Sequence, residues 1–562
     1  MNFYSPVVLM FALAANAQVI KTEKPPVVFL NGYQSNCSGS QFSNTFGKFD
    51  QIFQTAGRTT LFFDNCMFGG KPTIEELGND FRDYLAGLKY SDGSPVTQVD
   101  IVAHSMGGLI VRSYLAGKQP AADVYLPPAN PGIRKIVFLA TPHFGSPIAI
   151  MFGLDNQGRE LASGGLFVFD LGTWNQGTDD LRGIDSLALI GNVGTGQAVT
   201  AGFDDGVVGL TSASIAFAEP GHTRVIPYCH TGPGLVTIAG LCPPNAPGIA
   251  IGVNATDANA AATLSFLNDT PDWQSIGQSP STGGGLIARA KSADDQYLAI
   301  QSAKAGKDLN IQNSAIAWTD LLPAGPQDLM ITTPSGTLDA KFVLQAGYTT
   351  ALTVKSGPFI TRVLPSAAAL SPLAVAPGMF VAIYGSGLAG VQVRVGGVPA
   401  ALQFVSDTQV NVIVPDAAKG LTKFTVANGA GTHTVNVLVQ PAVPAIYTQN
   451  QSGTGPAAAL NALTNILVTS TTPLHASDYV SLYLTGLGTV HAVNGLQFAD
   501  NQPAVSVGGK PCRVTYAGRA PGYDGLDQIN CQLAPDIAPS PSAQVAVSSA
   551  GRTSNIPTLA IQ

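Results

Sequence analysis

A serine between a strand pattern and a helix pattern constrains the fold of this chain more than any other feature. An apolar run at 99–102 leads into Ser105, and the helix pattern of 109–114 follows almost at once. The neighbouring positions hold small residues, Ala103, Gly107 and Gly108. In a strand–turn–helix of this kind the serine is held in a strained conformation, and larger side chains two positions away would clash. The pattern predicts a nucleophile elbow, with the Ser105 hydroxyl exposed above a sheet.

The segments around this serine alternate between strand and helix patterns. Apolar runs typical of buried strands occur at 26–30, 59–63, 133–140, 187–190 and 223–228. Helix patterns occur at 74–88, which is amphipathic, and at 260–267. Strands that alternate with helices favour a mostly parallel sheet with helices on both faces. The first half of the chain is therefore predicted to be an α/β domain.

A serine nucleophile needs a base, and the base needs a carboxylate that orients it. After the strand pattern at 187–190 come Asp204 and Asp205, followed by a glycine. We choose Asp205 because it directly precedes the glycine, although acidic residues before glycine are also common turn formers. The carboxylate is therefore predicted at Asp205, with a plain turn as the alternative.

The base must come from seven histidines. His104 and His143 could line a cleft without acting as the base. His222 precedes the strand pattern at 223–228, whereas His230 follows it, at the carboxyl end where open α/β sheets place their sites. We predict His230 as the base and keep His222 as the alternative.

With these residues in place, the first half of the chain resembles the bacterial triacylglycerol lipases of the α/β-hydrolase superfamily, and more loosely the GPI inositol-deacylase-like hydrolases. The matching pieces are 103–108 (Ala-His-Ser-Met-Gly-Gly), 140–147 (Ala-Thr-Pro-His-Phe-Gly-Ser-Pro), 205–208 (Asp-Gly-Val-Val) and His230. The resemblance implies a lipase or esterase with Ser105 as nucleophile and Asp205 and His230 as its partners. It implies no cofactor, and without a clear match to the calcium site of some relatives we predict no metal.

Two backbone N–H groups are candidates for holding an oxyanion. The N–H of Met106, next to the nucleophile, points to where an oxyanion would form. In α/β-hydrolases the second donor lies in a loop after an earlier strand, and here the run 26–30 ends in Asn31-Gly32-Tyr33. The resemblance therefore implies Tyr33 and Met106 as the oxyanion donors. The chain departs from many relatives at Asn31, where they have histidine, and at Ala103, where they have glycine.

Composition favours an exported protein. Only 11% of the 562 residues are charged and the net charge is −7, which excludes a nucleic-acid binder. Residues 1–17 read as a signal peptide, with an apolar stretch and an Ala-Asn-Ala cleavage pattern, although basic residues are missing from its start. A buried strand or a membrane anchor are the alternatives there. No later segment is long and apolar enough to span a bilayer, so we expect a secreted, periplasmic or surface-exposed bacterial protein.

Six cysteines agree with export, and their positions suggest three pairs. Cys229 and Cys242 flank the loop of His230. The C-terminal part of the chain contains an internal repeat, and Cys512 and Cys531 of the second copy stand where the first copy has Ala400 and Val412. Both cysteines are present in one copy and absent from the other, as a disulfide between them predicts. Cys37 and Cys66 remain as the third pair. Each follows a predicted strand, and these two strands are expected to be neighbours in the sheet. None of the six belongs to a zinc-binding pattern.

The chain is predicted to continue in β-sandwich domains. Residues 18–277 make up the catalytic domain and are expected to bury a core of their own. A linker at 279–285 leads to short alternating strands, so 278–357 is predicted as a β-sandwich-like domain. The repeat lies in 358–450 and 451–562, where 381–388 echoes 480–487 and 393–400 echoes 505–512.

Both copies of the repeat resemble the IPT/TIG immunoglobulin-like modules, and a C-terminal domain common in secreted proteins of soil Acidobacteria. Such modules have no obvious catalytic residues. We therefore expect a spacer or a surface-presentation array, with contact to the cell surface or to a polymer as the alternative.

Residues 148–185 lie between two core strands and hold many Gly, Phe and Leu residues, but their apolar residues do not recur with a regular spacing. We interpret them as a cap or lid over an apolar acyl site, with a plain surface excursion as the alternative. The predicted substrate is an ester or lipid. A polyester depolymerase, phospholipase, amidase or acyltransferase would use the same motif, and a non-catalytic adhesion array is the remaining alternative.

Overall fold

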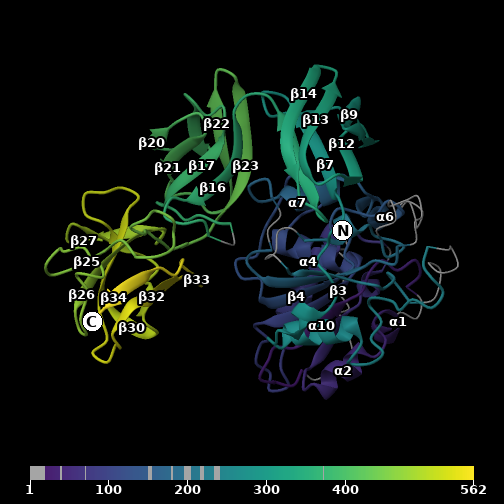
Figure 1. Cartoon of the computed structure of the whole chain (residues 1–562), viewed down its shortest axis with the longest axis horizontal. Coiled ribbons are helices and arrows are strands. Elements are labelled where there is room, and N and C mark those ends of the chain that lie inside the picture. Colours follow the sequence, from purple (N-terminus) through teal and green to yellow (C-terminus); the bar gives the residue numbers. More distant parts are fainter. Residues whose placement is uncertain are drawn as a thin grey trace, which may run out of the picture.

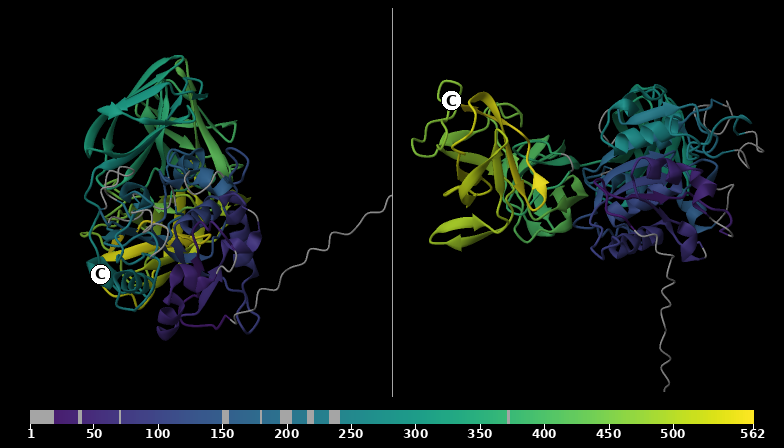
Figure 2. Two further views of the ribbon diagram at one scale, coloured as in Figure 1. Left: turned by 90° about the vertical axis from the view of Figure 1, so that its right-hand side faces the viewer. Right: turned by 90° about the horizontal axis from the view of Figure 1, so that it is seen from below.

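The computed structural model describes residues 19–37, 41–69, 71–149, 155–178, 181–194, 204–215, 221–232, 241–370 and 373–562. The predicted signal peptide lies outside the described residues. The α/β part of the chain lies on one side of the molecule, and the β-rich C-terminal parts form an arch from its top to the opposite side (Figure 1). In the view from below, the last part of the chain lies farthest from the α/β part (Figure 2).

A six-stranded sheet forms the centre of the α/β part, in the order β2-β1-β3-β4-β5-β6. All five neighbouring pairs are parallel. This confirms the predicted α/β fold class, and every strand coincides with an apolar run of the sequence. The strands are β1 (Val27–Leu30), β2 (Thr60–Phe63), β3 (Val99–His104), β4 (Ile133–Leu139), β5 (Asp185–Gly191) and β6 (Thr223–Ile226).

Helices cover both faces of this sheet because its central strands are apolar on both sides. In β1, Val28 and Leu30 pack on the side of α3 (Ile74–Gly87) and α4 (Met106–Ala116). Val27 and Phe29 pack in a separate cluster on the opposite face. That second face is covered by α1 (Phe42–Phe46), α2 (Phe49–Thr55) and α10 (Ala258–Leu267). The alternation of the strand therefore builds two cores, one on each face.

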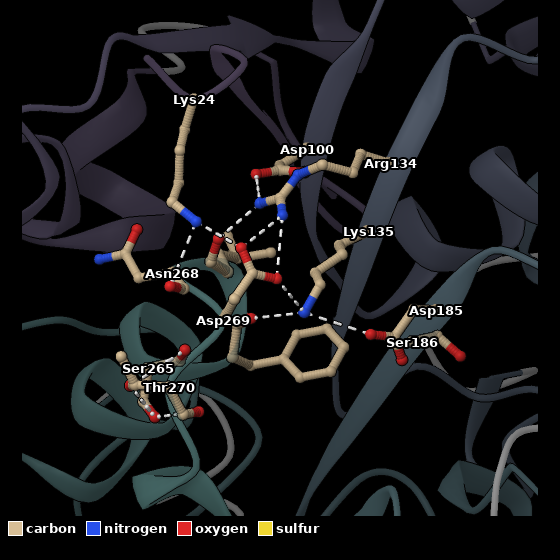
Figure 3. A network of polar contacts seen from close by, with 12 residues as sticks. Lys24, Asp100, Arg134, Lys135, Asp185, Ser186, Ser265, Asn268, Asp269 and Thr270 are labelled. Atoms are coloured by element: carbon tan, nitrogen blue, oxygen red, sulfur yellow. Dashed lines mark hydrogen bonds and ion pairs between the residues drawn. The ribbon is translucent and has the colours of Figure 1, made fainter. Parts of the chain in front are cut away.

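An ionic network closes the amino-terminal end of the sheet (Figure 3). Asp100, fully buried near the start of β3, accepts hydrogen bonds from Arg58 at 2.5 Å and Arg134 at 2.6 Å. Asp269, in the turn after α10, pairs with Arg134 at 2.9 Å and Lys135 at 2.8 Å. The network ties β3 and β4 to the turn that follows α10. It lies at the end of β3 opposite to Ser105.

Residues 284–355, here called the first β-domain, form two packed sheets in the orders β10-β9-β13-β14 and β11-β12-β7-β15. Within the second sheet β15 runs parallel to β7, and the short β8 pairs with β7 outside the main path. The strands are β7 (Gly284–Lys291), β8 (Tyr297–Leu298), β9 (Ser302–Ala305), β10 (Lys307–Asp308), β11 (Asn310–Gln312), β12 (Ile316–Leu322), β13 (Gly325–Thr333), β14 (Gly336–Leu344) and β15 (Thr349–Lys355).

The first repeat has two antiparallel sheets, β16-β17-β21-β20 and β19-β18-β22-β23, around one apolar core. Its strands are β16 (Phe359–Pro365), β17 (Phe380–Ser386), β18 (Gln392–Val395), β19 (Val398–Pro399), β20 (Leu402–Val405), β21 (Gln409–Ile413), β22 (Gly420–Asn428) and β23 (Gly431–Val439). The second repeat runs through β24 (Ala445–Ile446), β25 (Ala459–Asn461), β26 (Tyr479–Thr485), β27 (Val490–Val493), β28 (Leu496–Ala499), β29 (Ala504–Val507), β30 (Lys510–Arg519), β31 (Asp527–Gln532), β32 (Ser540–Ser549), β33 (Arg552–Thr553) and β34 (Thr558–Ile561).

Strand pairing shows that the two repeats are built alike. In the first, Val381 of β17 is paired with Val412 of β21. At the corresponding place in the second, Val480 of β26 is paired with Cys531 of β31. The echoed sequences therefore occupy equivalent strands, and Cys531 replaces a core valine.

The core of the α/β part continues into the first β-domain. Ile287 and Ile316 belong to the same apolar cluster as the residues of α3 and α4. The Trp318 ring of β12 lies against Gly164, where an added Cβ would collide with it. The expectation that residues 18–277 enclose a core by themselves is therefore incomplete, because part of that core comes from residues beyond 277.

A turn of the α/β part is also inserted against the first repeat. The Asn175 amide donates to the Leu373 carbonyl at 2.9 Å and accepts from the Leu438 N–H at 3.2 Å. The next residue, Gln176, accepts from the Val363 N–H at 3.0 Å. The bonds from Val363 and Leu438 use the open edges of β16 and β23, so the two sheets of the repeat are bridged by a segment of the predicted cap.

Candidate active site

Ser105 lies in the sharp turn between β3 and α4, with φ 53° and ψ −126°. A positive φ is strained for a residue with a Cβ, and such strain is tolerated where the surroundings enforce it. The flanking glycines are required here. A Cβ on Gly107 would lie 2.6 Å from the Leu30 carbonyl oxygen, and one on Gly108 would collide with the Thr141 side chain. The structure thus has the local geometry that the sequence predicts for a nucleophile elbow.

The structure brings Ser105, His230 and Asp205 together from three separate loops. His230 Nε2 lies 2.9 Å from Ser105 Oγ, and His230 Nδ1 lies 2.7 Å from Asp205 Oδ2. All three residues are buried. The second carboxylate oxygen of Asp205 accepts the N–H groups of Val207 at 3.0 Å and Val208 at 2.8 Å. The carboxylate is therefore held in place while its free edge faces the imidazole.

The two alternatives to these partners lie elsewhere. Asp204 accepts the Gly206 N–H at 2.9 Å through its side chain and stabilises the turn, whereas the carboxylate hydrogen-bonded to His230 is that of Asp205. The His222 Nδ1 lies 2.9 Å from the Ser186 carbonyl and 3.3 Å from Asp185, at the amino ends of β5 and β6. His222 is therefore at the opposite end of the sheet from Ser105.

His104 supports the histidine loop. Its Nε2 lies 3.0 Å from the His230 carbonyl oxygen and so donates a hydrogen bond to it, and the two rings are 4.8 Å apart. Burial, together with the nearby His230, holds the pKa of His104 well below its usual value, so the ring stays neutral. His143 is deeper, where Arg112 donates to its carbonyl at 2.9 Å. Neither histidine contacts the Ser105 hydroxyl as a base.

The loop that holds Gly32 and Tyr33 presses against the nucleophile. A Cβ on Gly32 would lie 2.7 Å from the Ser105 Cβ, so only glycine allows this approach. Asn31 accepts the Asn65 N–H at 3.0 Å, and the Asn65 side chain donates to the Gly32 carbonyl at 2.8 Å. Tyr33 follows this contact and Met106 begins α4. Both predicted oxyanion donors are therefore on segments that touch Ser105.

Several supporting residues could not be chosen from the sequence. Asn65, in the 3-10 turn η1 (Asn65–Phe68), carries no motif, yet it anchors the loop before Tyr33. Asp155 accepts a hydrogen bond from the Tyr33 hydroxyl at 2.9 Å, and the Lys71 ammonium lies 4.2 Å from the centre of the Tyr33 ring. Burial and Asp155 raise the pKa of Tyr33 to about 12, which keeps it a hydrogen-bond donor. These contacts join distant segments, so no local pattern could reveal them.

A cavity of about 430 Å³ opens beside the three residues. Ser105 and His230 are among its polar lining residues. Its apolar lining includes Ala149, Leu161, Val207, Val208 and Ile251. Ala149, Gly158 and Leu161 belong to the predicted cap, 148–185, whose described helices are α6 (Asn156–Glu160) and α7 (Leu166–Thr173). This excursion supplies one wall of the cavity.

The six cysteines form three disulfides, Cys37–Cys66, Cys229–Cys242 and Cys512–Cys531, with Cα–Cα distances of 5.3, 6.2 and 5.6 Å. The first fastens the segment after Tyr33 to η1, and the second adjoins His230.

Among the residues that the structure describes, no three His, Cys, Asp or Glu side chains are grouped to hold a metal ion. The described helices include none long and apolar enough to cross a bilayer.

Comparison with known proteins gives a match for one part of the chain. Residues 358–451 match the IPT/TIG domain family, whereas no curated protein matches. Phospholipase PlaB from Legionella pneumophila is similar in structure at 15% identity and a TM-score of 0.41, over 59% of this chain and 94% of that one. The lin2722 gene product from Listeria innocua is 18% identical at a TM-score of 0.23, over 36% and 82%. SGBP-B from Bacteroides ovatus, solved with a mixed-linkage heptasaccharide, is 13% identical at 0.21, over 49% and 65%.

The family match covers the first repeat and confirms the resemblance that its sequence suggests. The parallel sheet, the helices on both of its faces and the strained turn at Ser105 are those of the α/β-hydrolase fold. The chain therefore combines an α/β-hydrolase fold with a C-terminal all-β region in which residues 358–451 form an IPT/TIG domain.

Proposed function

We propose that the protein is an exported serine hydrolase that cleaves carboxylic esters. The observation that carries this proposal is the chain of hydrogen bonds from Ser105 through His230 to Asp205, with distances of 2.9 and 2.7 Å. A hydroxyl, an imidazole and a buried carboxylate at these distances are the parts that nucleophilic acyl transfer requires. The three disulfides support export, because such bonds persist in oxidising compartments.

In the first half of the proposed reaction, Ser105 Oγ attacks the acyl carbon and His230 Nε2 takes the hydroxyl proton. Asp205 accepts a hydrogen bond from His230 Nδ1–H and stabilises the imidazolium that forms. The N–H groups of Tyr33 and Met106 hold the negative oxygen of the tetrahedral intermediate. Its collapse breaks the ester bond, and the imidazolium gives its proton to the leaving alcohol.

In the second half, water attacks the acyl–Ser105 ester with His230 again as the base. The products are the free carboxylic acid and the regenerated serine. The apolar lining of the cavity favours an ester with an apolar acyl or alcohol group over a strongly charged substrate. A lipid or short-chain ester therefore fits best.

A series of p-nitrophenyl esters of increasing acyl length tests the proposal. We expect saturable hydrolysis that is abolished by a serine-directed phosphonate, with the label on the peptide that contains Ser105. Ser105→Ala should lower kcat by about 10³-fold or more without changing thermal unfolding, since only one oxygen is lost.

His230→Ala and His222→Ala form a matched pair for the base. The first should be nearly as inactive as Ser105→Ala, and the second should keep most of the activity because His222 lies at the far end of the sheet. An active Ser105→Ala variant, or an inactive but folded His222→Ala variant, would contradict the assignment.

A further inference from the structure

A second cavity lies where three parts of the chain meet, and it shares no lining residue with the cavity of Ser105. It measures about 620 Å³. Its walls come from the α/β part, the first β-domain and the first repeat, with lining residues in 123–125, 169–178, 291–297, 351–353, 359–362 and 423–436. Pockets between domains are frequent places for ligands. The chemistry of its walls therefore indicates what it could hold.

Gln176 contributes a buried amide to this cavity. The residue is 2% exposed, and its side-chain oxygen accepts the Val363 N–H at 3.0 Å. Its Nε2 has no hydrogen-bond partner among the residues that the structure describes. A buried donor without an acceptor costs about 1–3 kcal/mol, so native structures seldom leave one unpaired. Gln176 therefore has a buried amide donor that lacks an acceptor beside the cavity.

Arg362, on β16 next to Val363, contributes a second unpaired donor. Its Nη1 is buried, and in the described part of the chain no carboxylate or carbonyl contacts the guanidinium. Burial alone lowers the pKa of Arg362 from its ordinary value, as expected for a cation without a counter-ion. Gln176 is hydrogen-bonded to Val363, the residue after Arg362 on β16, and both Gln176 and Arg362 line the cavity.

The acidic residues of the same cavity do not supply the missing partner. Asp170 faces Arg289 at 3.5 Å, and burial raises the pKa of Asp170 to about 6. Asp295 pairs with Lys291 at 3.1 Å and accepts the Thr434 N–H at 2.9 Å. Two further carboxylates, Asp123 and Asp294, belong to exposed residues.

The rest of the lining includes another donor, several lysine, threonine and amide side chains, and apolar surface. His433 Nδ1 accepts the Ile360 N–H at 2.9 Å, so a neutral His433 carries its proton on Nε2. Burial lowers the pKa of His433 to about 3, which keeps the ring neutral near pH 7. Phe169, Trp174 and Leu352 add apolar walls.

We propose that this interdomain cavity binds a small organic carboxylate, with the carboxylate on Arg362 and Gln176 and the remainder of the molecule along the apolar wall. A guanidinium binds a carboxylate through two parallel hydrogen bonds, which would give the unpaired Nη1 of Arg362 an acceptor. The ligand chemistry has two sources, an aliphatic acid such as ester hydrolysis releases, or an acidic sugar. The binding of an aliphatic acid released by ester hydrolysis rests on the proposed function, whereas the binding of an acidic sugar does not.

Calorimetric titration of the full-length Ser105→Ala protein separates this proposal from turnover. Hexanoate and glucuronate are the two probes, and hexan-1-ol and glucose are their uncharged counterparts. We expect saturable one-to-one binding of at least one acid, at least tenfold tighter than that of its counterpart. The preferred acid identifies the source. Binding of neither acid up to about 10 mM, or equal binding of acid and counterpart, would overturn the proposal.

Two variants test the residues, each checked for unchanged thermal unfolding. Arg362→Gln removes the charge, and Gln176→Glu keeps the acceptor for Val363 while placing a negative charge at the free donor. Each should weaken acid binding at least tenfold. Arg394→Gln is the matched control, since Arg394 is an exposed arginine of the same repeat whose guanidinium contacts only the Gly397 carbonyl among described residues, at 2.9 Å. Undiminished binding by folded Arg362→Gln and Gln176→Glu proteins, or an equal loss in Arg394→Gln, would refute the assignment.

Discussion

At the scale of single residues, the proposed active site depends on which oxygen of Asp205 faces which partner. One oxygen accepts two backbone N–H groups, and the other lies 2.7 Å from His230 Nδ1. In Asp205→Asn the amide oxygen can keep the backbone bonds, so the NH₂ group faces the imidazole. That arrangement moves the proton to Nε2, where it cannot accept the Ser105 proton.

We therefore expect Asp205→Asn to lower kcat by about 10³-fold or more with little change in KM or in thermal stability. Asp204→Asn is the natural control, because that side chain accepts the Gly206 N–H, whereas Asp205 is the carboxylate hydrogen-bonded to His230. Steady-state rates of the two variants on one soluble ester make the comparison. An equal loss of kcat in both variants would contradict the assignment of Asp205 as the carboxylate that orients His230.

At the scale of elements, two disulfides of similar loop length have different expected effects. Cys229–Cys242 adjoins His230, whereas Cys512–Cys531 lies within the second repeat. Each is worth about 3 kcal/mol in the chain-entropy model.

Replacing Cys229 and Cys242 by alanine should therefore lower kcat, because the loop that positions His230 is loosened. Replacing Cys512 and Cys531 should lower the unfolding temperature of the second repeat and leave ester hydrolysis unchanged. Activity and calorimetric unfolding of the two double variants distinguish these effects. A fully active first variant would show that the loop is held without its disulfide.

The ionic network at the amino end of the sheet predicts a pH dependence. Burial acts to raise the pKa of Asp269, but hydrogen bonds from Lys135 and Lys24 and the charge of Arg134 hold it well below its usual value. Its ionised form therefore stabilises the fold above pH about 4, and this contribution is lost progressively as the pH falls below that.

Asp269→Asn should lower the free energy of unfolding at pH 7 by about 1 kcal/mol or less, since the side chain is 45% exposed and partly screened. The difference from the parent protein should shrink as the pH falls below 4. Denaturant unfolding at several pH values measures it. A difference that grows on acidification would contradict the proposed ion pairs.

At the scale of the whole molecule, the α/β part and the β-domains share apolar surface. Ile287 and Ile316 complete a cluster of the α/β part, and Asn175 and Gln176 of the cap region bond to the first repeat. The first β-domain and the first repeat therefore pack against the α/β part, including the cap region, of which Ala149, Gly158 and Leu161 line the Ser105 cavity.

A chain that ends at Gly277 should consequently unfold at a lower temperature than the full protein and lose much of its esterase activity. A chain that ends at Gly357 keeps Ile287, Ile316 and Trp318 and should recover most of both. Unfolding temperature and initial rate of the three chains test this order. If the shortest chain equals the full protein in unfolding temperature and in initial rate, the shared core contributes neither to stability nor to activity.

The sequence by itself determined the features that local patterns encode. The strained turn at Ser105, the six parallel strands and the equivalence of the two repeats follow from apolar periodicity, small residues and echoed segments. The placement of His230 beyond a strand end also followed, because parallel strands bring their carboxyl ends to one edge. Only the tertiary structure decided which polar groups meet across loops, such as Asn65 with Gly32, and where Gln176 and Arg362 have donors without a partner among the described residues. These contacts join segments far apart in the chain, and hydrogen bonds between such segments leave no periodic trace in the sequence.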